Sequence, residues 1–438
     1  MNSDKKIAFY TLGCKVNQYE TDSIKQQFKE KAYEIVKFDE KADIYIINTC
    51  TVTNIADRKS RNLLRKAKKK NPDSIVIAMG CYAQTNAKEI SEISEVDYII
   101  GNKDKQEIIK KIEMIKKNKE NKNENKGNKI NVNDIFLEKK FSEYNFGISK
   151  EMSRVYIKIQ DGCNNYCSYC KIPFARGKER SRNLDEIINE VEKVVKAGFF
   201  EIILIGINLG AYGRDLDSSL TLEDVLENVS NVKGVKRIRL GSIYPDNLSD
   251  RLIDLIKKRE NIMPHLHISL QNGDTEILKL MKRNYDRSQA LENLWKIKRL
   301  IPELELTADI IIGFPGEKEE NFINTYRFIK EIKFSDLHIF PYSDRENTLA
   351  SKYKNKVSSQ IKKERIKKIE VLQNEISENI RKKYISKKVE VLMEEKGWGY
   401  TKNYLKVFVE NSVEENKILK IKVVKTKKGL LIGEEEKI

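Results

Sequence analysis

Three of the six cysteines in this chain lie in one short segment, and their spacing is suited to an iron–sulfur cluster. Cys163, Cys167 and Cys170 form a CxxxCxxC pattern directly after an expected strand. A cube of four irons held by three thiolates keeps one iron without a protein ligand. That iron can bind a reactant, whereas a site with four cysteines suits a structural role or plain electron transfer. The pattern therefore predicts a reactive cluster.

A structural zinc ion is the alternative for the same loop. Zinc normally has four Cys or His ligands, and the chain contains no second CxxC motif. The nearest histidine in the sequence is His265, which folding would have to bring to the loop. The spacing favours the cluster over zinc.

The other three cysteines each come shortly after an expected strand. Short apolar, β-branched runs at 7–12, 43–48 and 74–79 alternate with helical stretches at 17–32 and 54–70, which predicts a parallel, doubly wound sheet. The carboxyl ends of such strands share the edge where ligands bind. We therefore expect the thiols that follow them to converge, and these belong to Cys14, Cys50 and Cys81. The alternative is three independent buried cysteines.

The rest of the chain divides by composition and periodicity. Residues 114–150 are rich in Lys, Asn and Glu and are predicted to be a linker that separates an α/β domain at 1–113 from a second βα-repeat domain at 151–356. Six strands are expected in the second domain, which favours a partial barrel over a closed eight-stranded one. They are placed at 154–160, 201–206, 236–240, 265–271, 304–313 and 336–341.

The C-terminal part is predicted to be a connecting helix at 357–384 and a small β-barrel at 385–438. The helix carries an apolar stripe. In the barrel, aromatic residues interleave with lysines, a pattern found in small barrels that bind nucleic acid but equally in the core of such a barrel. These aromatic residues are Trp398, Tyr400, Tyr404 and Phe408.

Charge and composition limit the class of protein. Net charge is +17, which favours a polyanionic partner such as RNA, or an acidic membrane surface. A basic run follows the cysteine loop at 171–182, with Glu179 as its acidic member, so positive charge is expected beside the site. No stretch reaches the roughly twenty apolar residues of a membrane-spanning helix, and no signal-peptide core is present. We expect a cytoplasmic protein with reduced thiols and no membrane partner.

With these motifs in view, the chain resembles the radical S-adenosylmethionine (SAM) methylthiotransferases, which have a terminal barrel of the TRAM type. Two segments, 11–21 and 48–61, are similar to the branch that acts on N6-threonylcarbamoyladenosine in tRNA. They read TLGCKVNQYET and NTCTVTNIADRKSR. The resemblance covers nearly the whole chain outside the Lys/Asn/Glu-rich linker.

The resemblance implies two [4Fe–4S] clusters, with SAM bound at the one held by Cys163, Cys167 and Cys170. An auxiliary cluster would be held by Cys14, Cys50 and Cys81. Contacts to SAM or substrate would come from Gly206, Asn208, Gln271 and Asp309. Position 206 begins Gly-Ile-Asn, where many radical SAM enzymes have Gly-Gly-Glu.

The implied reaction adds a methylthio group to C2 of threonylcarbamoyladenosine next to the anticodon of tRNA. A C–H bond of a neutral purine is too weak an acid for a side-chain base, so radical cofactors carry the chemistry and no catalytic side chain is expected. An electron donor and a sulfur donor are implied partners. Two alternatives stay open: the same chemistry on isopentenyladenosine in tRNA or on a ribosomal-protein aspartate, and a non-catalytic RNA-binding iron–sulfur protein.

Overall fold

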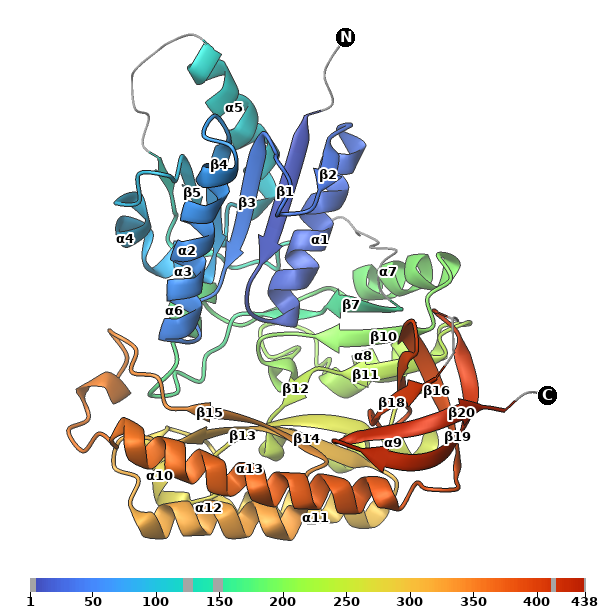
Figure 1. Cartoon of the computed structure of the whole chain (residues 1–438). Coiled ribbons are helices and arrows are strands. Elements are labelled where there is room, and N and C mark those ends of the chain that lie inside the picture. Colours follow the sequence, from blue (N-terminus) through green and yellow to red (C-terminus); the bar gives the residue numbers. More distant parts are fainter. Residues whose placement is uncertain (1–4, 121–128, 145–152, 411–414, 437–438) are drawn as a thin grey trace. The chain divides into compact units, whose positions relative to one another are not determined.

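The computed structural model describes residues 5–120, 129–144, 153–410 and 415–436, without the side chains of 116–120. The chain forms two compact units. Figure 1 shows the whole chain with its helices and strands labelled. The cysteine unit comprises the ranges 1–149, 160–182 and 343–348, and it contains all six cysteines. The barrel unit comprises 150–159, 183–342 and 349–438.

A six-stranded parallel sheet forms the centre of the cysteine unit, in the order β2-β1-β3-β4-β5-β6. Its strands are β1 Lys6–Thr11, β2 Glu34–Val36, β3 Ile44–Thr49, β4 Ile75–Gly80, β5 Tyr98–Ile100 and β6 Ile130–Asn131. Strands β2 and β3, which follow β1 in the chain, lie on opposite sides of β1, so the strand order reverses at β1. In open α/β sheets the crevice at such a reversal, at the carboxyl ends of the strands, is the usual ligand site.

Helices cover both faces of this sheet. Helices α1 (Lys15–Glu30) and α5 (Ile108–Glu120) pack on one face, where Ile24 and Phe28 meet Ile46 and Ile77. The opposite face carries α2 (Asn54–Lys70), α3 (Cys81–Thr85) and α4 (Ala87–Ser91). Every residue of β3 and β4 is buried, as expected for parallel strands between two helical layers. The doubly wound α/β fold predicted from the sequence is confirmed.

The predicted linker at 114–150 contains more structure than its composition indicates. Helix α5 continues to Glu120, β6 pairs with β5, and a short helix η2 spans Ile135–Leu137. Ile130 lies opposite Ile99, so the sheet gains a strand too short to be recognised from periodicity. Residues 121–128 and 145–150 of the predicted linker lie outside the described part of the chain.

The barrel unit contains parallel strands at all six expected positions and one further short strand, β12, and the partial βα barrel is confirmed. They form two sheets, β11-β10-β7 and β12-β13-β14-β15, connected by a parallel bridge between Ile238 and Ile262. The strands are β7 Arg154–Lys158, β10 Glu201–Ile205, β11 Arg237–Leu240, β12 Ser242–Ile243, β13 His265–Gln271, β14 Glu305–Ile312 and β15 Asp336–Pro341.

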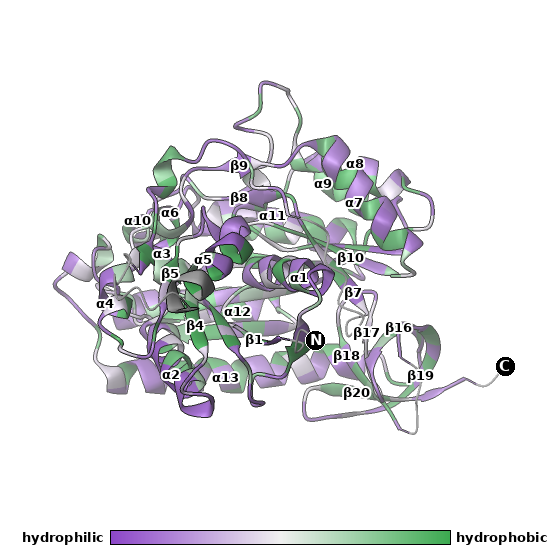
Figure 2. Cartoon of the chain, turned by 90° about the horizontal axis from the view of Figure 1, so that it is seen from above, coloured by the Kyte–Doolittle hydropathy of each residue, from purple (hydrophilic) through white to green (hydrophobic). Residues whose placement is uncertain are grey.

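Amphipathic helices connect these strands. Figure 2 shows hydrophobic and hydrophilic residues side by side on α7, α8 and α9, consistent with one face of each helix packing on the sheets. The helices are α7 Leu184–Lys196, α8 Leu222–Asn231, α9 Asp250–Lys258, α10 Thr275–Leu280, α11 Arg287–Leu300 and α12 Glu319–Ile332. No helix among the described residues is both long and apolar enough to cross a membrane.

Helix α13 (Ser359–Lys382) leads to a closed five-stranded barrel at the C-terminal end of the unit, as the sequence predicts. The barrel order is β16-β17-β18-β20-β19. Its strands are β16 Lys388–Glu395, β17 Trp398–Thr401, β18 Lys406–Val409, β19 Ile418–Lys427 and β20 Leu430–Glu435.

The C-terminal barrel is attached to the first three strands of the βα barrel by buried charge. The Arg239 guanidinium donates to the carbonyls of Thr401 and Lys402, at 2.9 Å each, and to Glu201 Oε1 at 2.9 Å. Tyr404 stacks on His265 with ring centroids 4.5 Å apart.

The neighbouring Tyr400 stacks on Tyr404 in turn, at 4.7 Å. Both of these aromatic residues contact the βα barrel of their own chain, Tyr404 through His265 and Tyr400 through the Arg154 guanidinium, which lies 5.0 Å from its ring centroid.

Candidate cysteine centre and polar sheet face

Three cysteines of the cysteine unit lie at the carboxyl ends of three adjacent strands. Cys14 is the N-cap residue of α1 and follows β1, Cys50 follows β3 directly, and Cys81 is the first residue of α3 after β4. Because β1, β3 and β4 are neighbours in the sheet, these thiols share one edge. The side chain of Cys14 is exposed, and those of Cys50 and Cys81 are buried.

A glycine makes room for this convergence. Gly13 has φ +97°, and a Cβ at this position would lie 2.8 Å from Cys50 Sγ. Burial, together with the adjacent thiols of Cys81 and Cys14, raises the pKa of Cys50 to about 12. Asn102 Nδ2 lies 3.7 Å from Cys81 Sγ. The three thiols are therefore near enough to influence one another electrostatically.

The second trio lies in a loop that backbone contacts hold closed. The loop leaves β8 (Gln160–Asp161) and returns through α6 (Ile172–Arg176) to β9 (Arg180–Ser181), which pairs antiparallel with β8. The Cys163 amide donates to the Gly177 carbonyl at 3.1 Å, and the Cys170 amide donates to the Cys167 carbonyl at 3.0 Å.

Gly162 fixes the start of this loop. Its φ is +72°, and a Cβ there would lie 1.8 Å from the Lys178 carbonyl oxygen, so another residue would push the two ends of the loop apart.

A buried ion network connects the two cysteine regions within the unit. Arg176, at the end of α6, hydrogen-bonds to Glu20 on α1, to Asn17 Oδ1 at 2.6 Å and to Asp161 Oδ2 at 3.2 Å. The Lys105 ammonium also contacts Glu20. Helix α1 begins directly after Cys14 and α6 begins shortly after Cys170, so this network fixes both thiol-bearing segments to each other.

Ion pairs of this kind neutralise much of the basic run at 171–182. The sequence predicted positive charge beside the site, but carboxylates outside the run pair with three of its arginines. Arg176 meets Glu20 and Asp161, Arg180 meets Asp161, and Arg182 meets Glu143. All three arginines are buried.

Sequence reasoning missed Arg345, which lies nearly three hundred residues from its partners. Its Nη2 donates to Asp57 Oδ2 at 2.6 Å and to Thr51 Oγ1 at 2.7 Å. Thr51 directly follows Cys50, so the segment 343–348 supports the loop that carries this thiol. A single arginine within a polar stretch carries no signal that would have revealed this role.

The donor sets fit clusters better than single ions. All six cysteines are described, and no disulfide joins them. A zinc ion with Zn–S bonds of about 2.3 Å would hold its sulfurs about 3.8 Å apart. Within the described ranges, the group that brings three donor atoms within 4.8 Å of one another is His267, Asp309 and His338, and neither cysteine trio meets that limit. Wider spacing suits a cluster, in which each thiolate binds a different iron.

The four residues implied in SAM or substrate binding lie in the barrel unit. Gly206 follows β10, and the buried Asn208 caps η3 (Leu209–Ala211). Gln271 ends β13 with φ +67°, a left-handed conformation that is uncommon for this residue type and is often found at functional positions.

Asp309 lies within β14 and accepts hydrogen bonds from His267 and His338. Burial raises the pKa of its carboxyl, but these two bonds outweigh burial and bring the pKa below its usual value.

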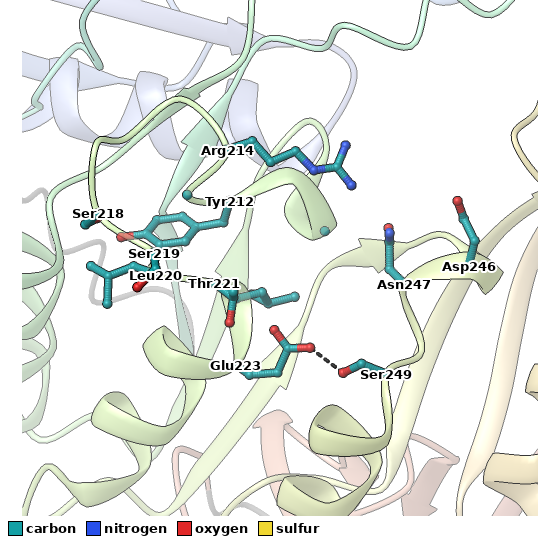
Figure 3. Close-up of a pocket in the computed structure, with 13 residues that line it drawn as sticks. Tyr212, Arg214, Ser218, Ser219, Leu220, Thr221, Glu223, Asp246, Asn247 and Ser249 are labelled. Atoms are coloured by element: carbon teal, nitrogen blue, oxygen red, sulfur yellow. Dashed lines mark hydrogen bonds between the residues drawn. The ribbon is translucent and has the colours of Figure 1, made fainter.

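A surface pocket of about 340 Å³ lies beyond β10 in the barrel unit (Figure 3). Polar groups including Arg214, Asp246 and Asn247 line it, and so do Glu223 and Ser249, whose side chains are hydrogen-bonded to each other. None of the candidate residues named above belongs to its lining.

Comparisons with known proteins agree with this architecture. Residues 6–101 match the uncharacterized protein family UPF0004, and residues 157–329 match the radical SAM superfamily. The threonylcarbamoyladenosine tRNA methylthiotransferase MtaB of Bacillus subtilis is 41% identical over 86% of this chain and 82% of its own length. The MtaB of Aquifex aeolicus is 42% identical over 83% and 86%.

More distant relatives extend the comparison. A tRNA-2-methylthio-N(6)-dimethylallyladenosine synthase of Clostridium botulinum is 33% identical over 88% of this chain and 85% of its own length. The solved structure of TsrM, a radical SAM methyltransferase from Kitasatospora setae, aligns with a TM-score of 0.58 over 77% of this chain and 75% of that one. At 12% identity it is evidence for the fold alone.

Proposed function

The chain belongs to the radical SAM methylthiotransferases, in the threonylcarbamoyladenosine tRNA branch, and from that premise we propose that it adds a methylthio group to C2 of threonylcarbamoyladenosine in tRNA. The observation that carries the proposal is the presence of two cysteine trios in one compact unit. One trio lies at the ends of three parallel strands, and the other lies in a closed loop. Family membership implies SAM and one [4Fe–4S] cluster.

We assign that cluster to Cys163, Cys167 and Cys170, and we propose a second cluster at Cys14, Cys50 and Cys81. When bound, such a cluster with SAM supplies a carbon-centred radical able to take hydrogen from an unactivated C–H bond. The protein's contribution is to supply thiolates, to hold the two trios in fixed relation and to limit access by water.

Named residues account for that contribution. The backbone of Gly162 and Gly177 closes the loop around Cys163. Arg176 and Glu20 connect this loop to the helix that follows Cys14. Binding iron requires thiolates, so the high pKa of the Cys50 thiol means that metal must displace its proton during assembly.

Contacts to SAM or substrate are proposed at Gly206, Asn208, Gln271 and Asp309. The exposed lysines of β19 and the overall charge of +17 favour a polyanionic substrate such as tRNA. An electron donor and a sulfur donor are further partners that the reaction requires. A cytoplasmic location is proposed because the six thiols must stay reduced.

Two matched triple variants test the assignment of the clusters. Replacing Cys163, Cys167 and Cys170 by Ala should abolish conversion of SAM to 5′-deoxyadenosine while iron remains at the other trio. Replacing Cys14, Cys50 and Cys81 by Ala should preserve SAM cleavage but abolish methylthiolation. If iron per chain were unchanged in both variants, the assignment of two sites would be wrong.

Nucleoside analysis of tRNA, with and without the protein, tests the substrate. The expected product is the methylthio derivative of threonylcarbamoyladenosine. A methylthio group on isopentenyladenosine would favour the second branch, and no modification of tRNA together with active SAM cleavage would favour a protein substrate. Absence of SAM cleavage by the reduced, reconstituted protein would favour a non-catalytic RNA-binding role.

A further inference from the structure

All three histidines of the chain lie on one face of the β13-β14-β15 sheet. His265 and His267 belong to β13, and His338 belongs to β15. Strand β14 lies between them and presents Thr307 and Asp309. In the strand register, His267 lies opposite Thr307, and Asp309 lies opposite His338.

The alternation of side chains fixes this face. On β13 and β14 the intervening residues are apolar and fully buried, so they form the opposite, core-facing side of the sheet. These residues are Leu266, Ile268, Leu270, Leu306, Ala308 and Ile310. The histidine face is more open, since the exposed fractions of the side chains are 14% for His267, 25% for Asp309 and 57% for His338.

The three side chains place their donor atoms at distances suited to one metal ion. Asp309 Oδ1 lies 3.2 Å from His267 Nε2 and 3.1 Å from His338 Nδ1. Around an ion with bonds of about 2.1 Å, adjacent donors lie about 3.0–3.4 Å apart. Both distances fall in that interval, and all three atoms lie within 4.8 Å of one another.

A second layer of contacts orients His267. Thr307 Oγ1 lies 2.8 Å from His267 Nδ1, and the same hydroxyl lies 3.1 Å from His265 Nε2. Metal-binding histidines typically use their second ring nitrogen in such a bond, which fixes the tautomer and leaves the other nitrogen to the ion. Thr307 therefore holds His267 with Nε2 toward Asp309.

We propose that His267, Asp309 and His338 form a binding site for a divalent transition-metal ion of the Zn²⁺ or Fe²⁺ class, separate from the cysteine trios. Two imidazoles and one carboxylate are a common donor set for such ions, with the remaining positions open to water or an oxygen ligand. The exposure of His338 places those positions on the open side of the sheet. The proposal does not depend on the proposed function.

Metal binding by the full-length protein with its cysteines loaded with iron tests the site, since iron then occupies the thiolates. The probes are Zn²⁺, counted per chain after dialysis, and Co²⁺, followed by its visible spectrum. Wild type should bind one equivalent more than His267→Gln or His338→Gln, and bound Co²⁺ should lack sulfur-to-cobalt charge-transfer bands. Asp336→Asn, an exposed change on the same face of β15, should bind like wild type.

Thr307→Val refines the test, because it keeps the shape of the side chain and removes the hydroxyl. Its Zn²⁺ affinity should fall about 10–100-fold while the stoichiometry is unchanged. His338 is largely exposed, so its variant should fold normally. If His338→Gln bound as much Zn²⁺ as wild type, or if the additional Co²⁺ showed thiolate bands, the three residues would form only a hydrogen-bonded network and the proposal would be refuted.

Discussion

Replacing Arg176 by Met should uncouple the two cysteine regions. The change keeps most of the side-chain volume and removes a guanidinium that is 1% exposed. It breaks hydrogen bonds to Glu20, Asp161 and Asn17. The buried carboxylates of Glu20 and Asp161 then have fewer positive charges near them to offset the cost of their burial.

The expected cost follows from the neighbours that remain. Removing one partner of a buried ion pair costs about 3–5 kcal/mol. Lys105 still contacts Glu20, and Arg180 Nη2 lies 3.6 Å from Asp161 Oδ2, so the lower end, about 3 kcal/mol, applies. Since about 1.36 kcal/mol corresponds to a factor of ten, amides of α1 and α6 should exchange about a hundredfold faster.

Hydrogen exchange measured by mass spectrometry on iron-free protein is the suitable assay. Fluorescence would not report this change, because both tryptophans, Trp295 and Trp398, lie in the barrel unit. Lys25→Met is the matched control on α1, since its ion pair with Asp22 is partly exposed and contributes at most about 1 kcal/mol. If Arg176→Met exchanged no faster in these helices than Lys25→Met, the network would not couple the two regions. Adding Glu20→Gln should cost less than the sum of the two single changes.

Two more predictions concern other parts of the chain. Arg239→Met leaves the buried Glu201 without its closest partner, so it should destabilise the attachment of the C-terminal barrel by about 3–5 kcal/mol and speed proteolysis between α13 and β16. The control is Arg251→Met, a change at an exposed ion pair. Cleavage of Arg239→Met no faster than cleavage of this control would contradict the prediction. The raised pKa of the Cys50 thiol predicts that the stability of the iron-free protein depends on pH. The protonated thiol contributes up to about 4 kcal/mol to the free energy of unfolding; this contribution is complete below pH 9 and is lost as pH rises toward 12. The free energy of unfolding, measured in denaturant between pH 8 and 11, should therefore fall less steeply with pH in Cys50→Ser than in wild type. An equal fall in both proteins would contradict a buried thiol at this position.

Much of the architecture was predictable because periodicity and residue type agree. The apolar runs before Cys14, Cys50 and Cys81 are long enough to identify β1, β3 and β4, and their shared edge follows from parallel topology. The six strands of the partial barrel were identified in the same way. Strands β2, β5 and β6 were missed because three residues or fewer show no period.

Long-range pairing was the part that local pattern could not supply. Glu20 and Asp57 lie far in the sequence from Arg176 and Arg345, so the local pattern predicted only positive charge beside the site for Arg176 and no role for Arg345, although both arginines are buried and paired. Tyr400 and Tyr404 gave a pattern typical of RNA-binding barrels, but their rings pack against His265 and against each other. An aromatic residue between lysines has the same local signature whether it faces a base or a neighbouring domain.

The cysteine unit is assembled from three separate stretches of chain, the last of which ends at residue 348. A ribosome that has released only the first 150 residues has delivered Cys14, Cys50 and Cys81, but neither Arg176, which closes the charge network, nor Arg345, which supports the segment after Cys50. Completion of this unit therefore waits until about four fifths of the protein has been synthesised. A fragment cut at the first apparent domain boundary would keep three of the thiols and lose the groups that hold them in place.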